Sequence, residues 1–263
     1  MHKGAFHRFA PALLAITAIA CASQTNPPVD SFGACNMSGA SERANNYSMH
    51  ETHSINSLAT IAFKGLHGSM LAPPLPIRDG RSMLVSTGGL VSMVIGDSIV
   101  WSNALGSIVP GLAVDSSGMI YAVALGSRAK GTSVYGITAD GKRAWTAQLP
   151  PYATGSDTSG FLALSLPLAI GDGVIVGSNA GRIDRIDGKG KHVWSVQRGA
   201  SVARSIAASP SIGIVAALTH NDYDLSDSII AIDPITGVER WSVATAGARI
   251  VEGPAIVGDL VIA

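Results

Sequence analysis

Short runs of apolar residues alternate with glycine, aspartate, serine and proline from Ile61 to the last residue of the chain. Runs of this kind, bounded by turn-forming residues, are typical of β-strands in an all-β domain. Residues 22 to about 57 differ, because they are polar, poor in aliphatic side chains and without a helical or strand period. We therefore expect a folded β domain over residues 58–263, preceded by a flexible, disordered polar tether over residues 21–57.

The apolar runs come in pairs that predict β-hairpins. Five segments have an apolar strand, a glycine-bearing turn and a second apolar strand, and glycine supplies the positive φ that tight hairpin turns need. These segments begin at Pro76, Leu112, Leu168, Ile206 and Pro254, and their turn glycines are Gly80, Gly118, Gly173, Gly213 and Gly258.

The tryptophans follow these hairpins at a nearly constant interval. The chain has four, Trp101, Trp145, Trp194 and Trp241, separated by 44, 49 and 47 residues. Three of them have a glycine four residues upstream, namely Gly141, Gly190 and Gly237. A period in the forties with one turn and one aromatic residue per unit indicates a β-propeller, with one four-stranded sheet per repeat. We expect each indole to lie across the gap to the neighbouring sheet and to bury on the order of 150–250 Å².

The last complete unit resembles a known repeat. Its pattern Ala231-x-Asp233-x-x-Thr236-Gly237-x-x-x-Trp241 is similar to the tryptophan-docking motif of the PQQ-type (quinoprotein-type) β-propeller family. The units ending at Trp145 and Trp194 keep the glycine and tryptophan but lack the alanine and aspartate, and the unit ending at Trp101 has only a displaced Gly96. The resemblance implies a structural, blade-docking role for Trp101, Trp145, Trp194, Trp241, Gly141, Gly190, Ala231, Asp233, Thr236 and Gly237.

The family's propellers usually have seven or eight blades, and eight blades of about 46 residues need roughly 370 residues. From Pro76 onward the chain has room for about four four-stranded blades and the start of a fifth. We therefore expect an all-β, partial β-propeller. Two arrangements stay open: an open arc, which we favour, and a small ring in which the last hairpin closes against the first blade.

The N-terminus has the features of an export signal. His2, Lys3, His7 and Arg8 form a basic region, and the apolar run from Phe9 to Ala20 is too short for a stable transmembrane anchor. We expect a signal peptide over residues 1–20. Ala18-Ile19-Ala20-Cys21 fits either ordinary cleavage before Cys21 or a bacterial lipobox in which Cys21 is lipidated, and we favour lipidation. Ala22-Ser23, without an aspartate, favours the outer membrane over the inner one, with the protein facing the periplasm or the cell surface.

Composition narrows the chemistry further. Lys and Arg total 18, as do Asp and Glu, so a net charge of zero gives no general attraction to nucleic acid. The enzymatic branch of the family implies a bound quinone, a calcium ion and an adjacent cysteine pair. This chain has only Cys21 and Cys35, both upstream of the repeats.

Three further motifs have simpler explanations. The acidic stretch His220–Asp227 lacks the glycine and distal glutamate of a calcium loop and is expected to be a solvated loop. Gly188–Lys191 is expected to be a turn rather than a phosphate loop. His192 and His220 have no ligand-spaced partner for zinc. We therefore expect no catalytic residue, cofactor or metal ligand.

These inferences predict an exported, lipid-anchored, non-catalytic propeller that acts as a scaffold for protein partners. The alternative is a fragment of a quinoprotein-like enzyme whose active-site blades lie outside this chain. The resemblance is closer in style to the non-enzymatic propeller lipoproteins of the outer-membrane β-barrel assembly machine than to the dehydrogenases.

Overall fold

The structure is a computed structural model of the 263-residue chain, and all of its regular elements are β-strands within the residues that it describes. Those residues are 15–17, 35–36, 60–62, 74–77, 79–86, 88–106, 111–125, 131–149, 165–178, 181–198, 201–209, 211–219, 227–245, 250, 253–257 and 259–262. Within these ranges no helix has the length and apolarity needed to cross a membrane.

Four antiparallel units of four strands follow one another along the chain, and each is one propeller blade. The strands of blade 1 are β4 (Leu75–Pro76), β5 (Arg81–Val85), β6 (Leu90–Ile95) and β7 (Ser98–Ala104). The strands of blade 2 are β8 (Leu112–Val114), β9 (Ile120–Ala124), β10 (Thr132–Ile137) and β11 (Arg143–Leu149). The strands of blade 3 are β12 (Leu168–Ile170), β13 (Gly173–Gly177), β14 (Arg182–Asp187) and β15 (His192–Gln197). The strands of blade 4 are β16 (Ser201–Ser209), β17 (Gly213–Thr219), β18 (Ser228–Ile232) and β19 (Glu239–Ala244).

A fifth hairpin follows blade 4. It consists of β20 (Ala255–Val257) and β21 (Leu260–Ile262), which pair antiparallel. The prediction of an all-β partial propeller, with four blades and the start of another, is therefore confirmed.

Three short strands lie at the N-terminal side. β1 (Ala15–Thr17), within the predicted signal peptide, pairs with β3 (Thr60–Ala62). β2 (Cys35–Asn36), within the predicted tether, adds a fifth strand beside β8 of blade 2. The rest of the predicted signal peptide and tether, including Cys21, lies outside the described residues.

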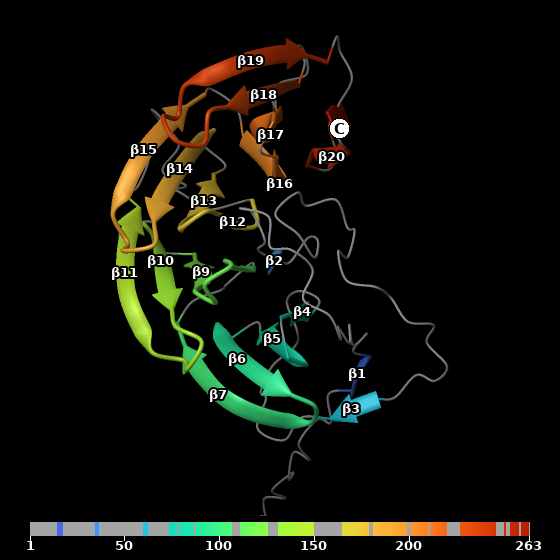
Figure 1. The fold of residues 1–263 in the computed structure, drawn as a ribbon, viewed down its shortest axis with the longest axis vertical. Helices are drawn as coiled ribbons and strands as arrows, with labels where there is room; N and C mark the ends of the chain where they lie inside the picture. The colour runs from blue at the N-terminus through green and yellow to red at the C-terminus, as the bar shows by residue number, and fades with distance from the viewer. Residues whose placement is uncertain are drawn as a thin grey trace, which may run out of the picture.

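The blades fan out as an open arc (Figure 1). In each blade the strands run in chain order, with the first strand toward the inside and the fourth on the outer rim, so β7, β11, β15 and β19 form the convex edge. Blade 1 and blade 4 stand at the two ends of the arc, and β20 lies beside the inner part of blade 4.

The core lies between blades rather than within one sheet. Inner strands such as β9 and β13 are buried along their whole length, because a neighbouring blade covers each of their faces. The outer strand β7 instead alternates between exposed and half-buried residues. Separate apolar clusters join blade 1 to blade 2, blade 2 to blade 3, blade 3 to blade 4, and blade 4 to the fifth hairpin. Each interface is thus a local core that holds two neighbours.

The hairpin glycines follow the prediction at three positions. Gly80, Gly118 and Gly213 have φ of 68°, 87° and 97°. The prediction was wrong for the third hairpin, where the residue with positive φ is Gly171, at 57°. Gly173 is needed for a different reason, since a β-carbon there would lie 2.3 Å from the carbonyl oxygen of Ile186. Gly258 lies outside the described residues.

Candidate functional site

All four tryptophans occupy the same place in their blades. Each lies on the fourth strand beside a shift in register, opposite a residue of the third strand. The opposed residues are Met93, Gly136, Arg185 and Ala231, respectively. A bulge at this point twists and bends the strand, which aims the indole toward the following blade.

The indole of Trp145 shows what this placement achieves. Its Nε1 donates a hydrogen bond to the carbonyl oxygen of Gly188 in blade 3, at 2.8 Å. Its ring covers Gly190 so closely that a β-carbon there would lie 2.7 Å from Cδ2. We call this arrangement, a tryptophan of one blade seated on the β-turn of the next, a tryptophan joint.

Two other joints have the same form. Trp101 donates to the carbonyl oxygen of Ala139 at 3.0 Å and covers Gly141. Trp194 donates to the carbonyl oxygen of Pro234 at 3.1 Å and covers Gly237. The Pro234 oxygen also accepts a hydrogen bond from Nη1 of Arg185, at 2.8 Å. The structure thus brings each glycine upstream of a tryptophan against the tryptophan of the preceding blade.

Glycine is required at the covered position for two independent reasons. Gly141, Gly190 and Gly237 have φ of 84°, 82° and 73°, a left-handed conformation that costs other residues free energy. A β-carbon at any of them would also lie 2.7–2.8 Å from the indole. The turn therefore presents a flat backbone surface to the ring.

Asp233 organises the turn that receives Trp194. Its Oδ1 accepts hydrogen bonds from the backbone nitrogens of Ile235 and Thr236 and from the Thr236 hydroxyl, at 2.9–3.0 Å. Its Oδ2 accepts one from the Arg240 guanidinium at 2.8 Å. The bond from Arg240 and then the backbone bond from Thr236 hold the pKa of Asp233 well below its ordinary value. Ala231, fully buried on β18, pairs with Trp241 and packs in the cluster that joins blade 4 to the fifth hairpin.

Blade 3 has an equivalent aspartate that the sequence motif missed. Oδ1 of Asp187 accepts hydrogen bonds from the backbone nitrogens of Lys189 and Lys191, at 2.9 and 2.8 Å. Asp187 lies one position closer to its tryptophan than Asp233 does, because one residue fewer separates the paired strand positions on either side of the turn in blade 3 than in blade 4. An alignment that allowed a single deletion in the turn would have found it.

Trp241 differs from the other three. Its side chain is 36% exposed, and no residue in the described part of the chain forms a hydrogen bond with its indole. Val243, two residues farther along the same strand, is exposed as well. At the other end of the arc, blade 1 has a two-residue turn, Gly96-Asp97, and beyond the adjacent residues no atom of the described residues lies within 4 Å of where a β-carbon of Gly96 would be. The two ends of the arc therefore differ: blade 4 has an exposed tryptophan, and the turn of blade 1 does not have the form that receives a tryptophan in the other blades.

A family model described as "Outer membrane protein assembly factor BamB" matches residues 87–263. The chain belongs to this BamB family.

Solved structures show the same fold. The chain is similar to BamB from Moraxella catarrhalis, with 23% identity, a TM-score of 0.54, and coverage of 70% of this chain and 52% of that one. It is also similar to the quinohemoprotein alcohol dehydrogenase ADHIIG from Pseudomonas putida HK5, with 16% identity, a TM-score of 0.52, and coverage of 65% and 33%. The computationally designed Ika8 protein matches with 13% identity, a TM-score of 0.56, and coverage of 76% and 56%. The chain spans about half the length of the Moraxella BamB structure. No curated protein sequence matches it.

A buried carboxylate supports the first strands of blade 2 in this BamB-family chain. Oδ1 of Asp115 accepts hydrogen bonds from the backbone nitrogens of Ser117 and Met119, and Oδ2 accepts one from the Tyr121 hydroxyl at 2.7 Å. Burial first, and then this bond, raise the pKa of Tyr121 far above its ordinary value. The Tyr121 ring lies 6.0 Å from the Trp145 ring, so this network backs the second joint.

A second buried carboxylate lies in blade 3. Asp184 is 1% exposed, and it accepts hydrogen bonds from Nε of Arg182 at 2.8 Å and, through Oδ1, from Nε2 of the half-exposed His192 at 2.9 Å. His192, which looked isolated in the sequence, therefore pairs with a carboxylate eight residues away. Among the described residues of this BamB-family chain, no group of three or more His, Cys, Asp or Glu side chains could hold a metal ion. Of the acidic stretch His220–Asp227, only Asp227 is described.

Proposed function

We propose that this chain is an exported, lipid-anchored and non-catalytic propeller that serves as a protein-interaction scaffold in the assembly of outer-membrane proteins. The family match over residues 87–263 carries the proposal, because that family is described as an outer-membrane protein assembly factor. We place the protein in the bacterial cell envelope, at the outer membrane.

The contacts of four carboxylates support a structural role. Asp115 and Asp187 hold turns, Asp233 shapes the surface that seats Trp194, and Asp184 is paired with Arg182. Each of these carboxylates is engaged in holding backbone or another side chain. A rigid array of blades with exposed connecting turns is well suited to presenting surfaces to protein partners.

Deletion of the gene in its native bacterium tests the scaffold role. We expect the amount of folded β-barrel proteins in the outer membrane to fall, and to recover when the chain is restored from a plasmid. We also expect the tagged chain to co-purify with the outer-membrane assembly machinery. Unchanged outer-membrane protein levels together with no association would overturn the proposal.

The lipid anchor is tested separately by mass spectrometry of the mature N-terminus. We expect a diacylglyceryl modification on Cys21, and loss of the membrane association when Cys21 is replaced by serine. An unmodified mature chain that begins at residue 21 or 23 would contradict the anchor and leave the scaffold role standing.

A quinoprotein-like enzyme remains the second candidate, since the dehydrogenase from Pseudomonas putida HK5 shares the fold at a TM-score of 0.52. The chain has two cysteines, which are not adjacent. Addition of pyrroloquinoline quinone and calcium to the purified protein, followed by absorption spectroscopy, distinguishes the two. Saturable binding of the quinone would favour the enzyme.

A further inference from the structure

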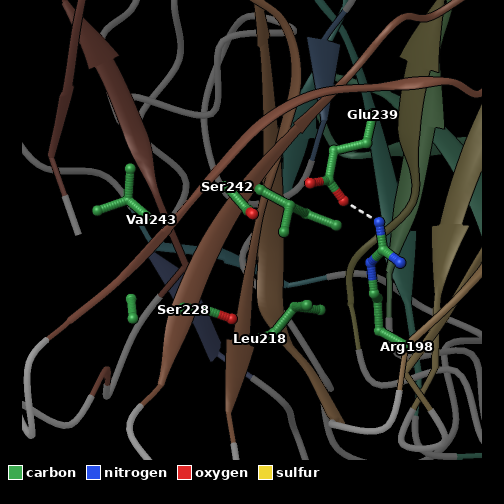
Figure 2. Close-up of a pocket in the computed structure, with 8 residues that line it drawn as sticks. Arg198, Leu218, Ser228, Glu239, Ser242 and Val243 are labelled. Atoms are coloured by element: carbon green, nitrogen blue, oxygen red, sulfur yellow. Dashed lines mark hydrogen bonds and ion pairs between the residues drawn. The ribbon is translucent and has the colours of Figure 1, made fainter.

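A pocket of about 340 Å³ lies between blade 3 and the outer half of blade 4 (Figure 2). Its apolar surface comes from Leu218 and Ile230, which are buried, and from Ala244. Arg198 from the end of blade 3 and Glu239 from blade 4 form an ion pair at one side. The remaining lining residues are Ser228, Ser242 and Val243.

The pocket lies where one repeat position differs between blade 3 and the two preceding blades. The fourth residue after the tryptophan is Leu105 in blade 1 and Leu149 in blade 2, and both are buried against the next blade. In blade 3 the same position is Arg198, whose side chain is 38% exposed and turned to Glu239. The interface of blades 3 and 4 therefore lacks the leucine that the two preceding interfaces contain.

The facing blade also has a smaller residue at this place. The third residue after the tryptophan is Gln148 in blade 2, opposite Ser133, and Gln197 in blade 3, opposite Arg182. In blade 4 the equivalent residue is Ala244, opposite Ser228. A buried leucine is thus replaced by the partly exposed Arg198, and an exposed glutamine by the shorter Ala244, and both of these residues line the pocket.

The chemistry of the lining selects the occupant. A volume near 340 Å³ is at the small end of ligand sites, which suits a side chain better than a large cofactor. Arg198 and Glu239 neutralise each other, so a charged group would have to break their ion pair to gain a partner. The serine hydroxyls can form hydrogen bonds with the backbone amides of an incoming segment.

We propose that this pocket receives an aliphatic side chain of leucine size from a protein partner, taking the place that Leu105 and Leu149 fill in the other interfaces. The inference rests on the proposed scaffold function and names the chemistry by which a partner would be recognised. The incoming segment brings the leucine from outside the chain, where the earlier blades supply their own.

Methyl-detected NMR on the full chain tests the pocket directly, with N-acetyl-leucinamide as the probe. We expect saturable shifts of the Ile230 and Leu218 methyl signals, while those of the interface between blades 1 and 2 stay unchanged. N-acetyl-alaninamide lacks most of the apolar surface that the leucine side chain would bury, so its affinity should be lower by at least about tenfold. Equal responses to the two probes, or none at these methyl groups, would overturn the proposal.

Two variants fill the pocket with residues that the chain itself uses. Arg198→Leu restores the leucine of blades 1 and 2, and Ala244→Gln restores the glutamine of blades 2 and 3. Each should abolish the probe-dependent shifts while the spectrum keeps its folded dispersion. Full binding by both variants would show that the probe binds elsewhere and would sink the proposal.

The same variants separate the pocket from the scaffold role. In the native bacterium, Arg198→Leu should reduce the co-purified partner several-fold at unchanged levels of the chain. If the partner is retained at the wild-type level, the pocket proposal fails and the scaffold stands. If the probe binds in vitro, but deletion of the gene leaves outer-membrane protein levels unchanged and no assembly machinery co-purifies, the scaffold fails instead.

Discussion

The ring of Trp145 lies against the backbone of Gly190 in the next blade, with Cδ2 2.7 Å from the place of a β-carbon. The contact joins residues 45 apart in sequence, and the hydrogen bond from the indole to Gly188 fixes its direction. Aromatic surface and backbone thus meet without an intervening side chain, and the interface depends on the absence of a single methyl group.

Replacing Gly190 with alanine should therefore be costly. The new methyl group meets the indole, and the residue must also hold a φ of 82°, so we expect a loss of roughly 3 kcal/mol in the free energy of unfolding. Gly80→Ala is the matched control, because Gly80 has a φ of 68° and, apart from the adjacent residues, no described residue has an atom within 4 Å of a β-carbon there. That variant should lose only about 1–2 kcal/mol. Urea unfolding followed by circular dichroism measures both, and equal losses would contradict the joint.

Trp145→Ala and Trp241→Ala should differ widely in their effect. Removal of Trp145 deletes a ring that contacts two blades and a hydrogen bond, at a cost of about 3 kcal/mol. Trp241 lacks a receiving turn in the described part of the chain, so its loss should cost below about 1 kcal/mol. Thermal unfolding of both variants checks the order. If Trp241→Ala proved the more damaging change, the ring would have to be seated on a surface outside the described residues.

Asp233 should make the free energy of unfolding decrease at acidic pH. Because the Arg240 guanidinium and the Thr236 backbone hold its folded pKa below its ordinary value of 3.8, its contribution is present above about pH 4. It is lost as the pH falls through the folded value. Asp233→Asn should thus destabilise the protein at neutral pH, and the difference from wild type should narrow toward pH 2 in acid-unfolding curves.

Tyr121 should resist deprotonation while the protein is folded. Burial and its bond to Asp115 raise its pKa, so the folded state is favoured below the ordinary value of 10 and loses stability as the pH rises beyond it. Tyr121→Phe leaves a buried oxygen of Asp115 without its donor and should cost about 1–3 kcal/mol. Ultraviolet titration of the phenols checks the first statement, since the variant should lose a tyrosine that ionises only on unfolding. A normal titration near pH 10 in the folded protein would contradict it.

The repeat of hairpin and tryptophan was enough to predict the all-β partial propeller. The periodic signal is informative because successive blades have the same strand arrangement and need an aromatic side chain at the same place. The sequence therefore repeats a tryptophan at 101, 145, 194 and 241. Register cannot be derived in the same way. The left-handed residue of the third hairpin is Gly171, not Gly173. The sequence did not distinguish the two, because a shift of two residues along a glycine-rich turn leaves the apolar pattern unchanged.

Contacts of individual side chains, within a blade and between blades, were the least accessible from the sequence. Asp187 escaped the motif because one residue fewer separates the paired strand positions on either side of its turn, and the pair of Asp184 with His192 depends on how two strands face each other. The role of Arg198 in forming the pocket can be inferred only from the structure, in which Leu105 and Leu149 are buried at the equivalent position of the other blades. Such features depend on three-dimensional equivalence between repeats, which a spacing in residues only approximates.

Every tryptophan joint links a ring to a turn that comes later in the chain, by 38, 43 and 40 residues at the three indole hydrogen bonds. A chain synthesised from its N-terminus therefore presents each indole before the surface that covers it has been made. During synthesis, the tryptophan of the most recently completed blade stays exposed to solvent until the next turn has formed. The direction of the joints therefore sets the order in which neighbouring blades can dock, and about one further blade of chain must be synthesised before each ring is covered.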